Sequence, residues 1–98
     1  MTEEHPLPPL AARFRAKPDV LVRELDGEAV LLDLDTGRYF GLNETGRRIF
    51  ELLGGERTLA NLLEILVGEF AAPREELERD LAELLGELER EGLISALE

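Results

Sequence analysis

Two acidic patterns in the middle of the chain have the residue types and spacing nearest to catalytic or metal-binding chemistry. The first, Asp35-Thr36-Gly37, is the tripeptide that carries the catalytic aspartate of aspartic proteases, and 98 residues is the size of a retroviral-type subunit. That protease fold is nearly all β, whereas the sequence after Asn43 is patterned for helices. We therefore interpret the tripeptide as an ordinary turn.

The second pattern imitates part of a calcium-binding loop. Asp33 and Asp35 stand two residues apart, and Glu44 follows eleven residues after Asp33, at the spacing of EF-hand ligands. However, Gly37 falls where a third ligand is needed, and Arg38 falls where the loop requires glycine. No helix is predicted before the pattern. We therefore expect no calcium site, and no metal or other cofactor.

The chain lacks the usual residues for nucleophilic or general-base catalysis. It has no cysteine and a single histidine, His5, in a proline-rich segment that offers neither a pocket nor an orienting partner. It also has no glycine-rich phosphate loop. Asn43-Glu44-Thr45 fits the glycosylation sequon, but without a secretion signal we interpret Asn43 as a helix cap. The sequence therefore predicts a protein that is not an enzyme.

The formal net charge of −11 bounds the possible partners. Such an acidic chain repels phosphate backbones, so we expect no nucleic acid partner and favour basic peptides or basic protein patches. The N-terminus has no apolar stretch of the signal-peptide kind, and no apolar run approaches the ~20 residues of a membrane span. We expect a cytoplasmic protein with no membrane partner.

Local patterns predict a small α+β domain with three antiparallel strands followed by three helices. Prolines oppose regular structure near the N-terminus, so residues 1–17 are expected to form a flexible tail and residues 18–98 the domain. Strands are expected at residues 19–25, 28–34 and 38–42. Asp26-Gly27 is a strong hairpin turn, because glycine accepts a positive φ at no steric cost.

The helices follow from caps and apolar periodicity. They are expected from the Asn43 cap to Leu53, from the Thr58 cap onward, and from Pro73 to Glu91. Gly54-Gly55 stops the first helix. After Gly92 ends the third helix, Leu93 and Ile94 are expected to fold back onto the core.

The outer strand, 38–42, leaves an open edge, and a helix beside such an edge makes a groove. Leu77, Leu81 and Leu84 in the stripe of the third helix are our candidates for ligand contact. Asp80 and Glu83 flank this stripe, where they could meet cationic side chains of a bound peptide. Most other carboxylates of that helix are interpreted as a solvated face.

The two neighbouring aromatic residues of the outer strand point to opposite faces. Phe40 is expected in the core. Tyr39 is expected either to pack on the first strand or to line the groove.

A longer motif combines several of these elements. Leu31-Leu32-Asp33 ends a hydrophobic strand, a turn follows, and then Gly37-Arg38-Tyr39-Phe40-Gly41-Leu42-Asn43 leads to Gly46 and Ile49. This order and spacing resemble the PqqD-like family, also called the RiPP recognition element. The later segments 56–59, 85–88 and 92–94 look like the second and third helices and the closing Gly-Leu of that family. The resemblance covers residues 18–94.

The resemblance implies a winged-helix-like fold and a non-catalytic domain that binds the leader of a ribosomally made precursor peptide. The leader would add as an antiparallel strand along residues 38–42, against the helix at 73–91. To the five helix candidates, the resemblance therefore adds the strand residues Arg38, Tyr39, Phe40, Gly41 and Leu42.

Within the family, a short free-standing chain is most similar to the recognition proteins of lasso peptide pathways. These work beside a separate leader peptidase and an ATP-dependent cyclase. The alternative is a peptide chaperone of the pyrroloquinoline quinone type, which pairs with a radical-SAM enzyme. A winged-helix regulator is a rival from another class, although carboxylates outnumber arginines in the third helix. A subunit-interaction module of the toxin–antitoxin type also stays open.

Overall fold

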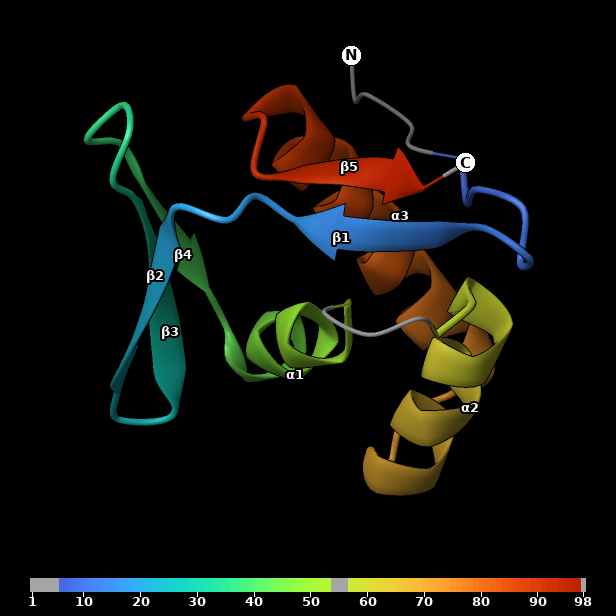
Figure 1. Cartoon of the computed structure of the whole chain (residues 1–98). Coiled ribbons are helices and arrows are strands. Elements are labelled where there is room, and N and C mark those ends of the chain that lie inside the picture. The colour runs from blue at the N-terminus through green and yellow to red at the C-terminus, as the bar shows by residue number, and fades with distance from the viewer. Residues whose placement is uncertain (1–5, 54–56, 98) are drawn as a thin grey trace, which may run out of the picture.

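A computed structural model describes residues 6–53 and 57–97 of the chain (Figure 1). The elements in these residues are β1 (Arg13–Ala16), β2 (Val20–Leu25), β3 (Glu28–Asp33), β4 (Tyr39–Leu42), α1 (Glu44–Leu53), α2 (Leu59–Glu69), α3 (Arg74–Arg90) and β5 (Ile94–Leu97). The predicted α+β class, with a three-stranded antiparallel sheet followed by three helices, is confirmed. His5 and the Gly54-Gly55 helix stop lie outside the described residues.

The three central strands form a meander in the order β2-β3-β4, so β2 and β4 are its two edges. Asp26 and Gly27 have φ values of 50° and 85°, and this pair of positive angles makes the tight hairpin turn that the sequence predicts. In the second turn, Gly37 has a φ of 77° and its N–H donates to the Asp33 carbonyl at 2.8 Å. Both predicted turns are confirmed.

A second, two-stranded sheet joins the two ends of the chain. β1 pairs antiparallel with β5, with Arg13 opposite Leu97, and the Phe14 side chain is only 4% exposed. The prediction of a tail through residue 17 is therefore wrong for this strand. A four-residue strand with alternating polar side chains has a weak local signal, and its partner is at the far end of the sequence.

The segment before β1 also completes the start of α2. The Leu59 N–H donates to the Ala12 carbonyl at 3.0 Å, and the Ala60 N–H donates to the Leu10 carbonyl at 2.9 Å. The predicted Thr58 cap is present, since its hydroxyl accepts from the Asn61 N–H at 3.2 Å. Together these bonds satisfy N–H groups of the first turn, which have no partner inside the helix.

The core lies between the sheets and the three helices. Its most fully buried large side chains are Leu31, Ile49, Leu59, Leu62, Leu63, Leu66, Leu77, Leu81, Leu85 and Leu88. Leu93 and Ile94 are 4% and 5% exposed, so the predicted return of the chain onto the core is confirmed. α1 packs against β3 and β4, and in Figure 1 all three helices lie on the same side of the meander.

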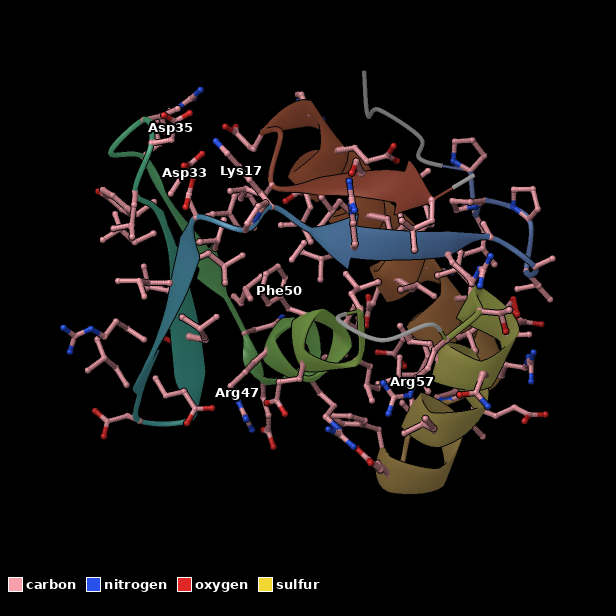
Figure 2. All side chains as sticks on the ribbon, in the orientation of Figure 1. Lys17, Asp33, Asp35, Arg47, Phe50 and Arg57 are labelled. Atoms are coloured by element: carbon pink, nitrogen blue, oxygen red, sulfur yellow. The ribbon has the colours of Figure 1, made fainter. Side chains whose placement is uncertain are left out.

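A partly buried ion pair ties the turn before β4 to the link between β1 and β2 (Figure 2). The Lys17 ammonium donates to the Asp33 carboxylate at 2.9 Å and to Asp35 at 3.3 Å. Asp33 is 3% exposed, and the bond from Lys17 is the main reason that its pKa lies below the ordinary value. The two aspartates of the rejected calcium pattern thus hold the position at which β4 begins.

Candidate functional site

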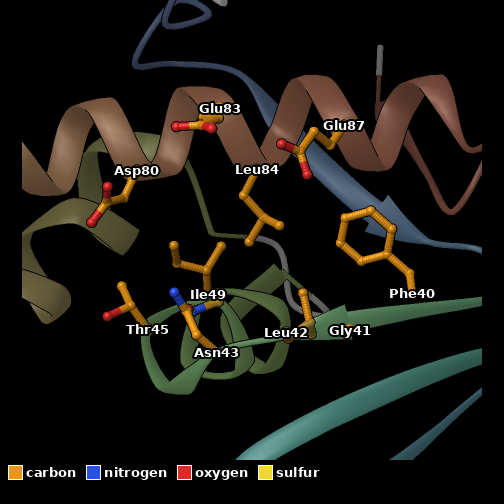
Figure 3. A pocket seen from close by; sticks show the side chains of 11 residues that line it. Phe40, Gly41, Leu42, Asn43, Thr45, Ile49, Asp80, Glu83, Leu84 and Glu87 are labelled. Atoms are coloured by element: carbon orange, nitrogen blue, oxygen red, sulfur yellow. The ribbon is translucent and has the colours of Figure 1, made fainter.

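A groove of about 200 Å³ runs between β4 and α3 (Figure 3). Its lining residues from β4 and the start of α1 are Phe40, Gly41, Leu42, Asn43, Thr45, Gly46 and Ile49, and those from α3 are Asp80, Glu83, Leu84 and Glu87. Leu84 lies between the carboxylates and points across the groove toward Ile49 and Leu42. The groove therefore has an apolar floor and an acidic wall.

The local sequence orients both walls. The Asn43 side chain accepts from the Gly46 N–H at 2.8 Å, which confirms the predicted cap and starts α1 directly after β4. A Cβ at Gly46 would lie 3.2 Å from that Asn43 oxygen, so the cap favours glycine there. At the other end of β4, the Arg38 guanidinium contacts the Glu91 carboxylate at 3.1 Å. β4 is thereby tied to α1 at one end and to the end of α3 at the other.

Several of the predicted site residues meet in this groove. They are Phe40, Gly41, Leu42, Asp80, Glu83 and Leu84. Phe40, which was expected in the core, is half-buried and packs against the core from the edge of the groove.

The other four predicted residues lie elsewhere. Leu77 and Leu81 are 2% and 0% exposed in the core, because the stripe of α3 faces inward and only Leu84 reaches its margin. Tyr39 is 79% exposed and, together with Phe40, lines a small hollow at the start of β4 rather than the groove of Figure 3. β3 lies between β4 and β2, so Tyr39 does not pack on β2. Arg38 is exposed and its side chain is engaged with Glu91.

Five lining residues of the groove were not predicted from the sequence, and among them Glu87 is the one that carries a charge. Asp80, Glu83, Leu84 and Glu87 stand at positions i, i+3, i+4 and i+7, and this spacing puts them on one face of a helix. Helical spacing alone could therefore have grouped Glu87 with the acidic candidates. Asn43 was recognised as a cap, Gly46 and Ile49 were named only as parts of the family motif, and nothing local marks Thr45.

The backbone of β4 offers hydrogen-bonding groups to this groove. The Asp33 N–H donates to the Arg38 carbonyl, and the register continues with Leu31 opposite Phe40. In an antiparallel ladder, hydrogen-bonded pairs alternate with pairs whose N–H and C=O groups point outward. Phe40 is therefore bonded to β3, whereas Tyr39 and Gly41 direct their backbone groups to the open edge.

The electrostatics of the groove favour a cationic ligand. The pKa of Asp80 is raised, first by burial and then by the negative charges of Glu76 and Glu83. In the described part of the chain, no lysine or arginine forms an ion pair with Asp80 or Glu83. A cation brought into the groove would relieve this repulsion.

Other chemistry finds no support among the described residues. Residues 6–53 and 57–97 contain no cluster of three histidine, cysteine, aspartate or glutamate side chains able to hold a metal ion. Within the same ranges, no helix combines the length and the apolar character needed to cross a membrane.

Comparison with known proteins identifies the family to which this chain belongs. Residues 28–94 match the family of the coenzyme PQQ synthesis protein D (PqqD). A search of curated proteins gave no match.

Two solved structures are similar over most of the chain. TbiB1 in complex with the TbiA(beta) leader peptide has 33% identity and a TM-score of 0.72, over 83% of this chain and 94% of that one. Lasso peptide synthetase B1 complexed with the leader peptide has 34% identity and the same TM-score, over 89% of this chain and 100% of that one. The heterocyclase TruD, with 22% identity and a TM-score of 0.61, covers 88% of this chain but 12% of its own, and it shares the fold alone.

Proposed function

The chain belongs to the PqqD family, and from that premise we propose that it binds the leader segment of a ribosomally made precursor peptide. The leader adds to β4 as a further antiparallel strand and lies in the groove against α3. The chain itself carries out no chemistry on the peptide. Its two relatives with 33% and 34% identity are both described in complex with leader peptides.

The observation that carries this proposal is the open edge of β4 beside a groove with an apolar floor and an acidic wall. Tyr39 and Gly41 leave four backbone groups, two donors and two acceptors, without a partner in β3. An added strand pairs with them through its own main chain, so this part of the affinity depends little on the leader sequence. Unpaired strand edges otherwise favour aggregation, because another chain can pair with them. A bound peptide would occupy this edge and satisfy its backbone groups.

The groove supplies the sequence preference. Side chains of an added strand alternate between the two faces of the sheet. Those opposite Phe40 and Leu42 point toward α3, where Leu84 offers an apolar contact. Neighbouring positions reach the acidic wall of Asp80, Glu83 and Glu87. We therefore propose a leader with an apolar anchor and at least one lysine or arginine on the same face.

The purpose of such binding is delivery. Holding the leader raises the effective concentration of the precursor at an enzyme that the chain also contacts. We propose that this enzyme set is the leader peptidase and the cyclase of a lasso peptide pathway, since the two solved relatives above 30% identity include a lasso peptide synthetase B1 protein. A radical-SAM enzyme is the alternative recipient, as for a chaperone of the pyrroloquinoline quinone type.

Hydrogen exchange of the backbone amides tests this proposal at single-residue resolution. The probe is the leader of a short precursor encoded beside this chain, and its scrambled sequence is the control. Binding should protect the amides of Tyr39 and Gly41, whereas those of Phe40 and Leu42 are already protected by β3. Saturable binding of the leader without new protection at Tyr39 and Gly41 would refute strand addition. No binding of any encoded leader would refute the function itself.

A further inference from the structure

A second apolar surface lies on the face of the meander opposite the helices. Strand alternation puts one set of side chains from all three strands on this outer face. Its apolar members are Leu21 and Leu25 of β2, Val30 and Leu32 of β3, Leu34 after β3, and Tyr39 of β4, and the charged residues Arg23 of β2 and Glu28 of β3 lie on the same face. No described helix or strand covers it in Figure 1.

The register makes this outer face continuous. Leu21 is opposite Leu32, and Leu32 is opposite Tyr39, so the three form one row across the sheet. Leu21 is 47% exposed and Tyr39 is 79% exposed. The next row holds Arg23, Val30 and Gly41, and a Cβ at Gly41 would meet no atom within 4 Å. The surface is thus apolar across all three strands in the row of Leu21, carries one arginine in the next row, and is flat at Gly41.

Nothing in the fold requires these side chains to be apolar. The core is on the other side of the sheet, and polar residues at the solvated positions of an antiparallel sheet are the ordinary arrangement. Leu25 and Leu34 are 65% and 56% exposed, so their apolar surface stays in contact with water. A contiguous exposed apolar patch of this kind marks an interaction site.

We propose, resting on the function proposed above, that the outer face is where the enzyme that processes the bound precursor docks. The partner that fits is a protein with an apolar patch edged by basic side chains. The rim is acidic, with Asp26 and Glu28 at the hairpin end of the sheet and Asp35 at the other. The net charge of −11 makes any partner with basic residues electrostatically favourable.

The same charge disfavours a second copy of this chain as the occupant. Two copies joined face to face would bring two acidic rims together, and like charges across an interface oppose association. The position of the surface also suits an enzyme. β4 contributes its edge to the leader groove and the Tyr39 side chain to the outer face, so the two sites share one strand. An enzyme on the outer face would therefore hold its active site close to the bound leader.

The test compares leader binding with enzyme binding in the same variants. Leu21→Lys and Leu25→Lys change the outer face and touch no groove residue. Val67→Lys is the matched control, because Val67 is a 40% exposed apolar residue of α2. The probes are the fluorescently labelled leader and the purified leader peptidase and cyclase encoded beside this chain. Enzyme affinity is measured by biolayer interferometry on the full chain with leader present.

Both outer-face variants should bind the leader within about twofold of the wild type, while the affinity for at least one enzyme falls at least ~10-fold. Val67→Lys should change neither. Unchanged enzyme binding in both outer-face variants would overturn the proposal, as would a wild-type chain that binds leader but neither enzyme. Sedimentation that shows a wild-type dimer and a monomeric Leu21→Lys variant would assign the face to a second copy instead. A wild-type chain that does not bind the leader would refute the proposed function, and this result is distinct from a failure of the docking proposal.

Discussion

A proline at position 41 separates strand addition from every other way of filling the groove. Gly41 does not bond to β3, because its backbone groups point to the open edge, so Gly41→Pro removes a donor that the folded chain does not use. Proline is tolerated at such edge positions of a sheet. A Cβ at this position also meets no atom within 4 Å, so the substitution creates no clash inside the domain. The variant should therefore fold.

The loss of affinity follows from the hydrogen bonds that the leader can no longer form. The Gly41 N–H disappears, and the pyrrolidine ring occupies the edge that the leader strand must approach. That ring also displaces the strand from the Gly41 carbonyl and from one group of Tyr39. Each net hydrogen bond contributes about 0.5–1.5 kcal/mol, so two or three lost bonds cost about 2–4 kcal/mol. This corresponds to roughly 30- to 1000-fold weaker binding.

Fluorescence anisotropy of the labelled leader measures this loss directly. Gly41→Ala is the matched control: it keeps the N–H, its methyl group projects onto the outer face, and its Kd should stay within about threefold of the wild type. Thermal unfolding of both variants shows that they are folded. A folded Gly41→Pro variant with wild-type affinity would mean that the leader does not pair along β4, and the edge argument would then be wrong.

Three further predictions concern the parts that position and charge the groove. Phe14→Ala should lower the free energy of unfolding by about 3–5 kcal/mol in urea melts because it empties a core position, whereas Leu10→Ala, at an exposed site, should cost far less. The pKa of Asp33 is lower in the folded chain than its ordinary value of 3.8. The ionised Asp33 carboxylate therefore contributes fully to the free energy of unfolding above pH 3.8, and this contribution is lost as the pH falls through the folded-state pKa. The unfolding midpoint of the wild type should therefore fall more steeply than that of Asp33→Asn between about pH 5 and pH 2, and parallel curves would contradict this role. Because burial raises the pKa of Asp80, a basic leader should bind more weakly as the pH falls from neutral toward the carboxylate range. The Asp80→Asn variant should lose much of this pH dependence and bind the leader about two- to fivefold more weakly at pH 7. Equal effects from Glu75→Gln would indicate only a general effect of the chain's charge.

The groove shows how far helix periodicity reaches as a predictor of site residues. The spacing of α3 correctly put Asp80, Glu83 and Leu84 near the open edge. It also nominated Leu77 and Leu81, which belong to the same stripe but are buried. A stripe has a centre and two margins, and only the packing of α3 against its neighbours decides which residues become the margin.

The short-range features of this chain were determined by the sequence itself. The Asp26-Gly27 turn needs positive φ angles, and the Asn43 and Thr58 caps each accept a bond from the N–H group three residues on. Prolines and glycines mark the other boundaries between elements. Each of these depends on side chains only a few residues apart. The meander, the three helices and the open edge of β4 could therefore be predicted from local patterns in the sequence. The resemblance to the PqqD-like family rests on the same residues.

Only the tertiary structure decided what lies against what. β1 forms because Arg13–Ala16 pairs with β5, which lies near the other end of the sequence. No pattern within β1 itself predicts such a pairing. The outer face of the sheet is exposed because all three helices pack on one side, which alternation along a strand cannot predict. The groove likewise forms where β4 and α3 are brought together by a core whose members are far apart in sequence. Local propensity sets the elements, but long-range packing sets which of their faces remain open to a partner.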